Sequence, residues 1–123
     1  MSSLGLALSP VALPGDCEII LSTERKLSAS FTLTNKLVDI LDHFPGEPIV
    51  AGYMQLIWLE HLMCKVVGSV VAFDVLDIKF IHKISIPSVI KIEMSWDVEN
   101  TIYRFILSDE FEVKTKGRLK ITK

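Results

Sequence analysis

One helical segment in the middle of the chain limits the folds that the rest of it can adopt. From Gly52 to Val67, residues recur at intervals of three and four, the period of an α-helix: Tyr53, Leu56, Ile57, Glu60, His61, Cys64 and Val67. The other side of this helix is also mostly apolar, with Met54, Trp58, Leu59, Leu62 and Met63. A helix that is apolar nearly all round is buried nearly all round, and Gly68 supplies a C-terminal stop. The remainder of the chain must therefore enclose this helix.

Strand-like segments lie on both sides of the helix. Alternating and β-branched residues predict strands over 17–22, 27–33, 70–81, 84–96, 101–107 and 111–121. Short polar segments predict turns at 24–26, 97–100 and 108–110, and two prolines with a glycine predict a loop at 43–48. We expect an α+β fold in which an antiparallel sheet wraps around one long central helix. A single domain is expected over residues 1–123, with residues 1–12 as an irregular lead-in.

Composition narrows the classes of partner. The chain has 123 residues, enough for one compact domain, and half of them are apolar. Its mean hydropathy of +0.42 is high for a small monomer, so we expect a subunit interface. A net charge of −2 predicts neither nucleic acid nor an anionic membrane as a partner. The longest apolar stretch, residues 48–59, is too short to span a bilayer. Two cysteines make no disulfide framework, so a reducing cytoplasm is expected.

The segment before the helix carries a specific motif. Residues 43–52 read HFPGEPIVAG. This run resembles the signature HFPGxPxxPG of the β-hydroxyacyl-[acyl carrier protein] dehydratases, which have the hot-dog fold, with Ala51 in place of the usual proline. Shorter similarities extend over about residues 13–121 and resemble the short dehydratase branch of aryl-polyene and related pathways; they lie at 31–33, 55–58, 79–80, 96–97 and 117–119.

The resemblance implies a role for each residue of the motif. Dehydration of a 3-hydroxyacyl thioester needs a base at C2 and an acid at the C3 hydroxyl. The base of the family corresponds to His43, and an imidazole is neutral at cellular pH. The backbone N–H of Gly52 would donate to the thioester carbonyl at the helix start. The remaining substrate-binding positions implied are Phe44, Pro45, Gly46, Tyr53 and Ile57. Neither a cofactor nor a metal ion is expected.

The sequence departs from the family at the acid. The acidic residue of the family lies fourteen positions after the histidine, and that position here is Ile57. Glu60 is three residues further on the same helical face, about 4.5 Å deeper. It is the candidate for a relocated acid, and the alternative is that Glu60 or His61 faces solvent or a subunit boundary. Glu60, His61 and Cys64 crowd into one helical turn, which does not give tetrahedral zinc geometry.

Three functions follow, and the residues leave enzymatic activity open. The first is a dehydratase-like protein of fatty-acid or polyene biosynthesis, acting on thioesters of acyl carrier protein or coenzyme A. The second is a non-catalytic acyl-binding or partner subunit that completes a heterodimeric dehydratase. The third is a hot-dog thioesterase, against which the HFPG motif argues. A homodimer is expected, or a heterodimer with a related hot-dog subunit. The basic residues between 114 and 123 predict a solvated strand face that an acidic carrier protein could contact.

Overall fold

The structure, a computed structural model, describes residues 17–33, 52–85, 88–99 and 101–122. It contains one helix, α2 (Gly52–Val67), and six strands within these residues. The strands are β1 (Glu18–Ser22), β2 (Lys26–Leu33), β3 (Phe73–Phe80), β4 (Ser88–Trp96), β5 (Ile102–Ser108) and β6 (Val113–Ile121). The helix has the bounds that the sequence predicts.

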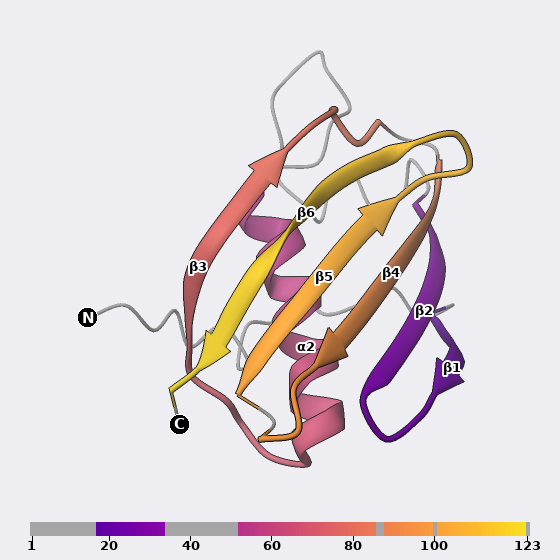
Figure 1. The fold of residues 1–123 in the computed structure, drawn as a ribbon. Helices are drawn as coiled ribbons and strands as arrows, with labels where there is room; N and C mark the ends of the chain where they lie inside the picture. The colour runs from indigo at the N-terminus through magenta and orange to yellow at the C-terminus, as the bar shows by residue number, and fades with distance from the viewer. Residues whose placement is uncertain (1–16, 34–51, 86–87, 100, 123) are drawn as a thin grey trace.

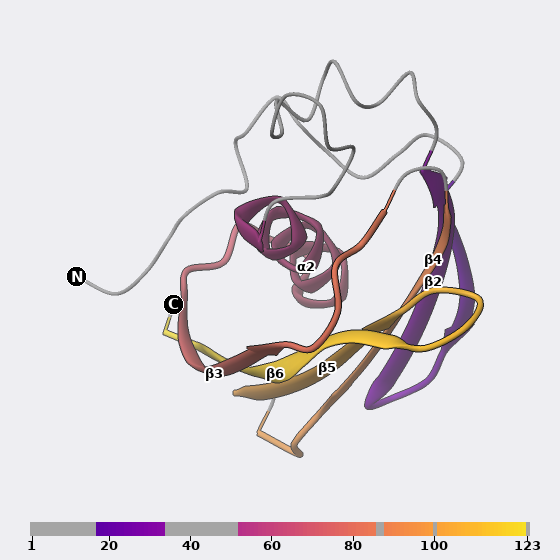
Figure 2. The same cartoon turned by 90° about the horizontal axis from the view of Figure 1, so that it is seen from above.

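The strands form one antiparallel sheet that curves around the helix. Their order is β1-β2-β4-β5-β6-β3, so β1 and β3 are the two edge strands. Seen from above, the sheet bends around one side of α2 (Figure 2). The predicted α+β arrangement of a sheet around a central helix is confirmed.

The core lies between the concave face of the sheet and α2. In β4, Ile90, Ile92 and Met94 are buried, and the residues between them are exposed, as strict alternation predicts. On the helix, Trp58 is fully buried, and its ring meets that of Phe31 edge-on with centroids 4.9 Å apart. Such aromatic pairs stabilise a core beyond the area that they bury. The apolar side chains of α2 are therefore buried against the concave face of the sheet, where they form the core.

The helix ends where the sequence predicts. Gly68 adopts a φ of +85°, a conformation that glycine tolerates best, and its N–H donates to the carbonyl of Cys64 at 2.8 Å. Cys64 is partly buried against the core as a free thiol. Its predicted role as a small core residue is confirmed.

Three strands start two or more residues later than the sequence predicts. β3 begins at Phe73 rather than at residue 70, and β4 begins at Ser88 rather than at residue 84. β6 begins at Val113 because Asp109 Oδ1 accepts the backbone N–H groups of Phe111 and Glu112, which closes a turn at the point where a strand was expected. Apolar composition alone does not reveal such a side-chain cap.

The C-terminal basic face is less solvated than the sequence predicts. Lys114 is only 8% exposed, and its ammonium lies 2.7 Å from Glu112 and 3.4 Å from Asp109. The hydrogen bond to Glu112 is the main cause that raises the pKa of Lys114. Arg118 Nε donates to Asp77 at 2.7 Å, and this contact lowers the pKa of the Asp77 carboxyl. The expectation of a solvated strand face is therefore wrong for Lys114, whereas the side chain of Arg118 is paired with Asp77 but remains 41% exposed.

Gly117 lets β3 and β6 approach closely. A Cβ at this position would meet the backbone carbonyl oxygen of Asp77, and would lie 2.9 Å from Ile78 Cα and 3.0 Å from Phe105 Cζ. The register of β3 shifts at the same level, between Val75 and Asp77. The site has no room for a side chain.

We expect Gly117→Ala to lower the free energy of unfolding by about 1–3 kcal/mol, because the added methyl overpacks against backbone that cannot move aside. Urea denaturation followed by circular dichroism measures this loss. Lys116→Ala, an exposed change on the same strand, is the control and should stay within about 0.5 kcal/mol. Equal stabilities of the two variants would contradict the steric explanation.

Candidate functional site

Gly52 is the first residue of α2, at the end of the sheet where β3 finishes. The first amides of a helix have no partner within the helix, and the helix dipole makes this end positive. A carbonyl oxygen that gains negative charge is stabilised by such a group of donors. The backbone amides at the start of α2 therefore form hydrogen-bond donors that their own helix does not pair.

The aromatic ring of Phe80 lies against Gly52. A Cβ on Gly52 would fall 2.8 Å from Phe80 Cζ and 3.1 Å from Cε1. The ring thus occupies the space that a side chain at position 52 would need. A larger residue at the helix start would require the ring of Phe80 to move aside.

A buried hydrogen bond fixes the first turn of the helix to the sheet. Thr115 Oγ1 on β6 donates to Gln55 Oε1 at 2.6 Å, and both residues are buried. Thr115 is also the register partner of Phe80 across β3 and β6. Two contacts consequently hold the start of α2: the ring of Phe80 lies against Gly52, and the hydrogen bond from Thr115 reaches Gln55.

The position of the acid carries a buried apolar side chain. Ile57 is 3% exposed, and Glu60, one turn later on the same face of α2, is fully buried. The expectation that Glu60 could face solvent or a subunit boundary is therefore wrong. His61 is partly buried, and its Nε2 has no hydrogen-bond partner among the described residues. The helix α2 therefore carries Gly52, Ile57 and Glu60. The carboxylate of Glu60 is the furthest of the three from the start of the helix.

The remaining predicted site residues lie outside the described residues. His43, Phe44, Pro45 and Gly46 belong to this group, and so does the side chain of Tyr53. Their roles stay predictions.

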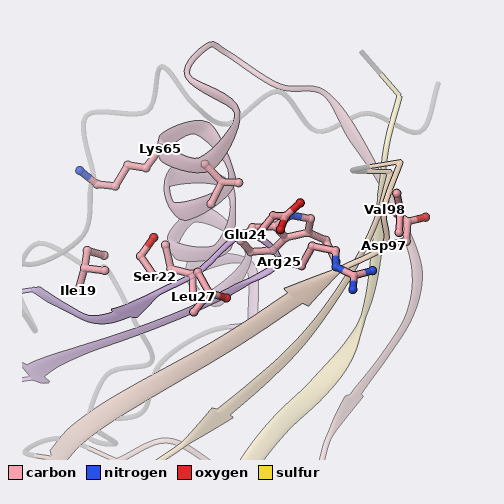
Figure 3. A pocket seen from close by; sticks show the side chains of 11 residues that line it. Ile19, Ser22, Glu24, Arg25, Leu27, Lys65, Asp97 and Val98 are labelled. Carbon is pink, nitrogen blue, oxygen red and sulfur yellow. The ribbon is translucent and has the colours of Figure 1, made fainter.

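A cavity of about 640 Å³ opens at the other end of the helix (Figure 3). It lies between the last turn of α2, which contributes Lys65, and the β1–β2 hairpin, which contributes Glu24, Arg25 and Leu27. It shares no residue with the predicted acyl slot beside Gly52. Its lining mixes two cations, two carboxylates and apolar groups, so no single ligand chemistry is favoured there.

Among the described residues, no three His, Cys, Asp or Glu side chains come together in a way that could hold a metal ion. No helix in this part of the chain is long and apolar enough to cross a membrane.

Neither Phe80 nor Thr115 has a role that is predicted from the sequence. Phe80 lies within one of the segments that resemble the dehydratases, but its proximity to Gly52 depends on how β3 is placed against α2. Thr115 is one polar residue in a strand of alternating polar residues. Only the register of β3 and β6 brings both to the helix start.

Solved structures with the same fold include dehydratases and thioesterases. One is the dehydratase heterocomplex ApeI:P from Xenorhabdus doucetiae, with a TM-score of 0.74 and 18% identity, covering 87% of this chain and 94% of that one. Another is the dehydratase domain from the CurF module of the curacin polyketide synthase, with a TM-score of 0.68 and 15% identity, covering 87% of this chain but 42% of that one. A third is a hypothetical thioesterase with coenzyme A from Streptococcus pneumoniae TIGR4, with a TM-score of 0.64 and 12% identity, covering 87% and 86% of the two chains. These likenesses confirm the predicted hot-dog fold.

A comparison of sequences gives the family. No curated protein matches the chain. Residues 20–118 match the ApeI-like family, which is described as ApeI dehydratase, and this range covers the described strands except Glu18 and Ile19 of β1 and the part of β6 that follows Arg118. The match spans well over half of the sequence and agrees with the resemblance that the HFPG motif predicts. The chain belongs to the ApeI-like dehydratase family.

Proposed function

We propose that this protein binds a 3-hydroxyacyl thioester at the start of α2 and takes part in its dehydration. The observation that supports this most is Gly52, which opens the helix with donors directed out of its first turn. The thioester oxygen accepts a hydrogen bond from this end of the helix, which stabilises the enolate that forms when C2 loses its proton. The acyl group is carried by acyl carrier protein or by coenzyme A.

The proton at C2 is removed by His43, the histidine of the HFPG motif. A neutral imidazole accepts that proton, and the C3 hydroxyl then leaves as water once an acid protonates it. Ile57 cannot supply this proton. The site of one chain is therefore incomplete on the acid side, and this is the main difference from a complete dehydratase.

A partner subunit supplies the missing carboxylate in our proposal. β3 is an edge strand of the sheet that the described residues form, so its outer backbone groups can pair with a strand of another chain. Leu76 and Ile81 add exposed apolar surface along and just beyond this edge. The ApeI:P structure is a complex of two different subunits, which supports a heterodimer over a homodimer for this chain. This proposal combines the first two functions predicted from the sequence, because the protein would act in dehydration as one subunit of a shared site.

Glu60 is the second source of an acid. It is fully buried in α2, one turn beyond Ile57. To reach it, the substrate would have to bind about 4.5 Å deeper along the helix. Displacements of about 1 Å already impair catalysis strongly, so the partner is the favoured source.

We expect 3-hydroxyacyl pantetheine to shift the backbone amide resonance of Gly52 more than that of any residue in the second half of α2. The carbonyl oxygen of the ligand accepts a hydrogen bond at this end of the helix. A titration followed by ¹H–¹⁵N correlation spectra measures the shift, and the amide of Gly68, beyond the far end of the helix, is the internal control. Larger shifts around Lys65 and Leu27 would mean that the ligand binds in the distant cavity, and would contradict the proposed site.

A further inference from the structure

The side of β3 that faces the helix ends in an aromatic residue that the helix does not cover. Phe80 lies opposite Thr115 in the β3–β6 register, and residues that face each other across antiparallel strands share a face of the sheet. Thr115 is fully buried and bonded to α2, so Phe80 also faces the concave side. At the other end of β3, Phe73 is fully buried, whereas Phe80 is 52% exposed. The ring of Phe80 lies against Gly52, the first residue of α2, so the helix does not cover the whole ring.

The backbone that carries Phe80 is held in place beyond the end of β3. The N–H groups of Ile81 and His82 both donate to the carbonyl of Lys114, at 2.8 and 3.1 Å. The side chain of Lys114 is itself paired with Glu112 and Asp109. The ring of Phe80 therefore projects from a fixed support, with its tip against Gly52 and much of its surface open.

We propose that Phe80 is a specificity-determining wall of the acyl slot and limits the bulk that the substrate carries at C2. This inference rests on the proposed function. A carbonyl oxygen bonded to the Gly52 amide lies about 2.9 Å from that nitrogen, so the carbonyl carbon and C2 come within contact distance of the ring. A methyl group on Gly52 would fall 2.8 Å from Phe80 Cζ, so the ring would have to shift to admit it. The ring accommodates an unbranched C2 and excludes a methyl branch there.

The test compares two probes, 3-hydroxyhexanoyl-pantetheine and its 2-methyl analogue, by isothermal titration calorimetry. Wild-type protein should bind the unbranched probe at least about tenfold more tightly, the usual effect of one misfit methyl group in a closely packed apolar site. Phe80→Ala should reduce this preference to less than about threefold, because the wall is gone. Phe80→Leu, which keeps an apolar branch, should give an intermediate value.

Phe111→Ala is the matched control. Phe111 is 87% exposed on the β5–β6 turn. Its substitution by alanine makes the same chemical change at a position away from Gly52. This variant should keep the wild-type preference. A loss of preference in Phe111→Ala equal to that in Phe80→Ala would overturn the inference.

Gly52→Ala tests the same contact from the other side. Its methyl group would push on the far end of the Phe80 ring, so unbranched binding should weaken about tenfold in the wild-type background. In the Phe80→Ala background the same change should cost less than about threefold, since the two residues then no longer compete for space. Additive effects would contradict the contact as the cause.

The outcomes separate this inference from the proposed function. Wild-type protein that binds neither probe removes the proposed function, and the inference falls with it. Wild-type protein that binds the unbranched probe, together with a Phe80→Ala variant that keeps the full preference, leaves the function standing and overturns only the role of Phe80.

Discussion

Ile57→Glu is expected to raise the rate of 3-hydroxyacyl thioester dehydration by the purified protein by about 10²–10⁴-fold, the usual contribution of a general acid. In the proposed mechanism, the wild-type chain removes the C2 proton, but the hydroxyl group leaves without assistance. Ile57 is 3% exposed, so a carboxyl in its place is poorly hydrated and its pKa is raised toward the range that suits an acid. Absorbance of the conjugated thioester product measures the rate. Ile57→Gln, which has the same shape but no proton to give, is the control and should stay at the wild-type rate.

Mixing the wild-type chain with a hot-dog homologue that carries the helix acid should give the same gain without a mutation. Light scattering on the same mixture shows whether the two chains pair. Robust activity of the wild-type protein alone, lost in Glu60→Gln, would overturn the shared site and make Glu60 the relocated acid.

His43→Ala is expected to lower the rate of the acid-restored protein by about 10²–10⁴-fold, because no other group is proposed to take the proton at C2. The matched variant is His82→Ala. His82 is exposed beside Glu112 at 3.5 Å, and its loss should leave the rate unchanged. Both are measured in the Ile57→Glu background, where the rate is high enough to see a fall.

Full activity in His43→Ala would remove the motif histidine as the base. It would also remove the main reason to carry the dehydratase mechanism over to this chain. A thermal melt of each variant separates a lost base from a lost fold.

The fold could be predicted from the sequence because its strongest signals are local. The interval of three and four between apolar residues located α2, and Gly68 located its end. The same reasoning misplaced the start of β6, because the turn there is set by Asp109, whose carboxylate accepts two backbone amides. The prediction that Lys114 is solvated was also wrong, because its ammonium pairs with the carboxylate of Glu112 in a largely buried position.

The candidate site could be predicted only in part, since it combines a motif with contacts between distant segments. The HFPG motif and the missing acid at Ile57 are visible in the sequence. The contact of Phe80 with Gly52 and the hydrogen bond of Thr115 with Gln55 are not, because each joins residues that lie far apart in the chain. They follow from the strand order, and periodicity does not reveal which strand lies beside which end of the helix.

The strand order also determines when, during synthesis on the ribosome, the start of α2 can pack against its strands. β3 follows α2 directly in the chain, yet its neighbour in the described sheet is β6, which is synthesised after β4 and β5. A nascent chain that has not yet released β6 has neither the strand that pairs with β3 nor the hydroxyl that binds Gln55. Pairing between such distant segments is slow. We therefore expect this end of the apolar helix to stay uncovered until β6 is available, and apolar surface exposed in this way is prone to aggregation.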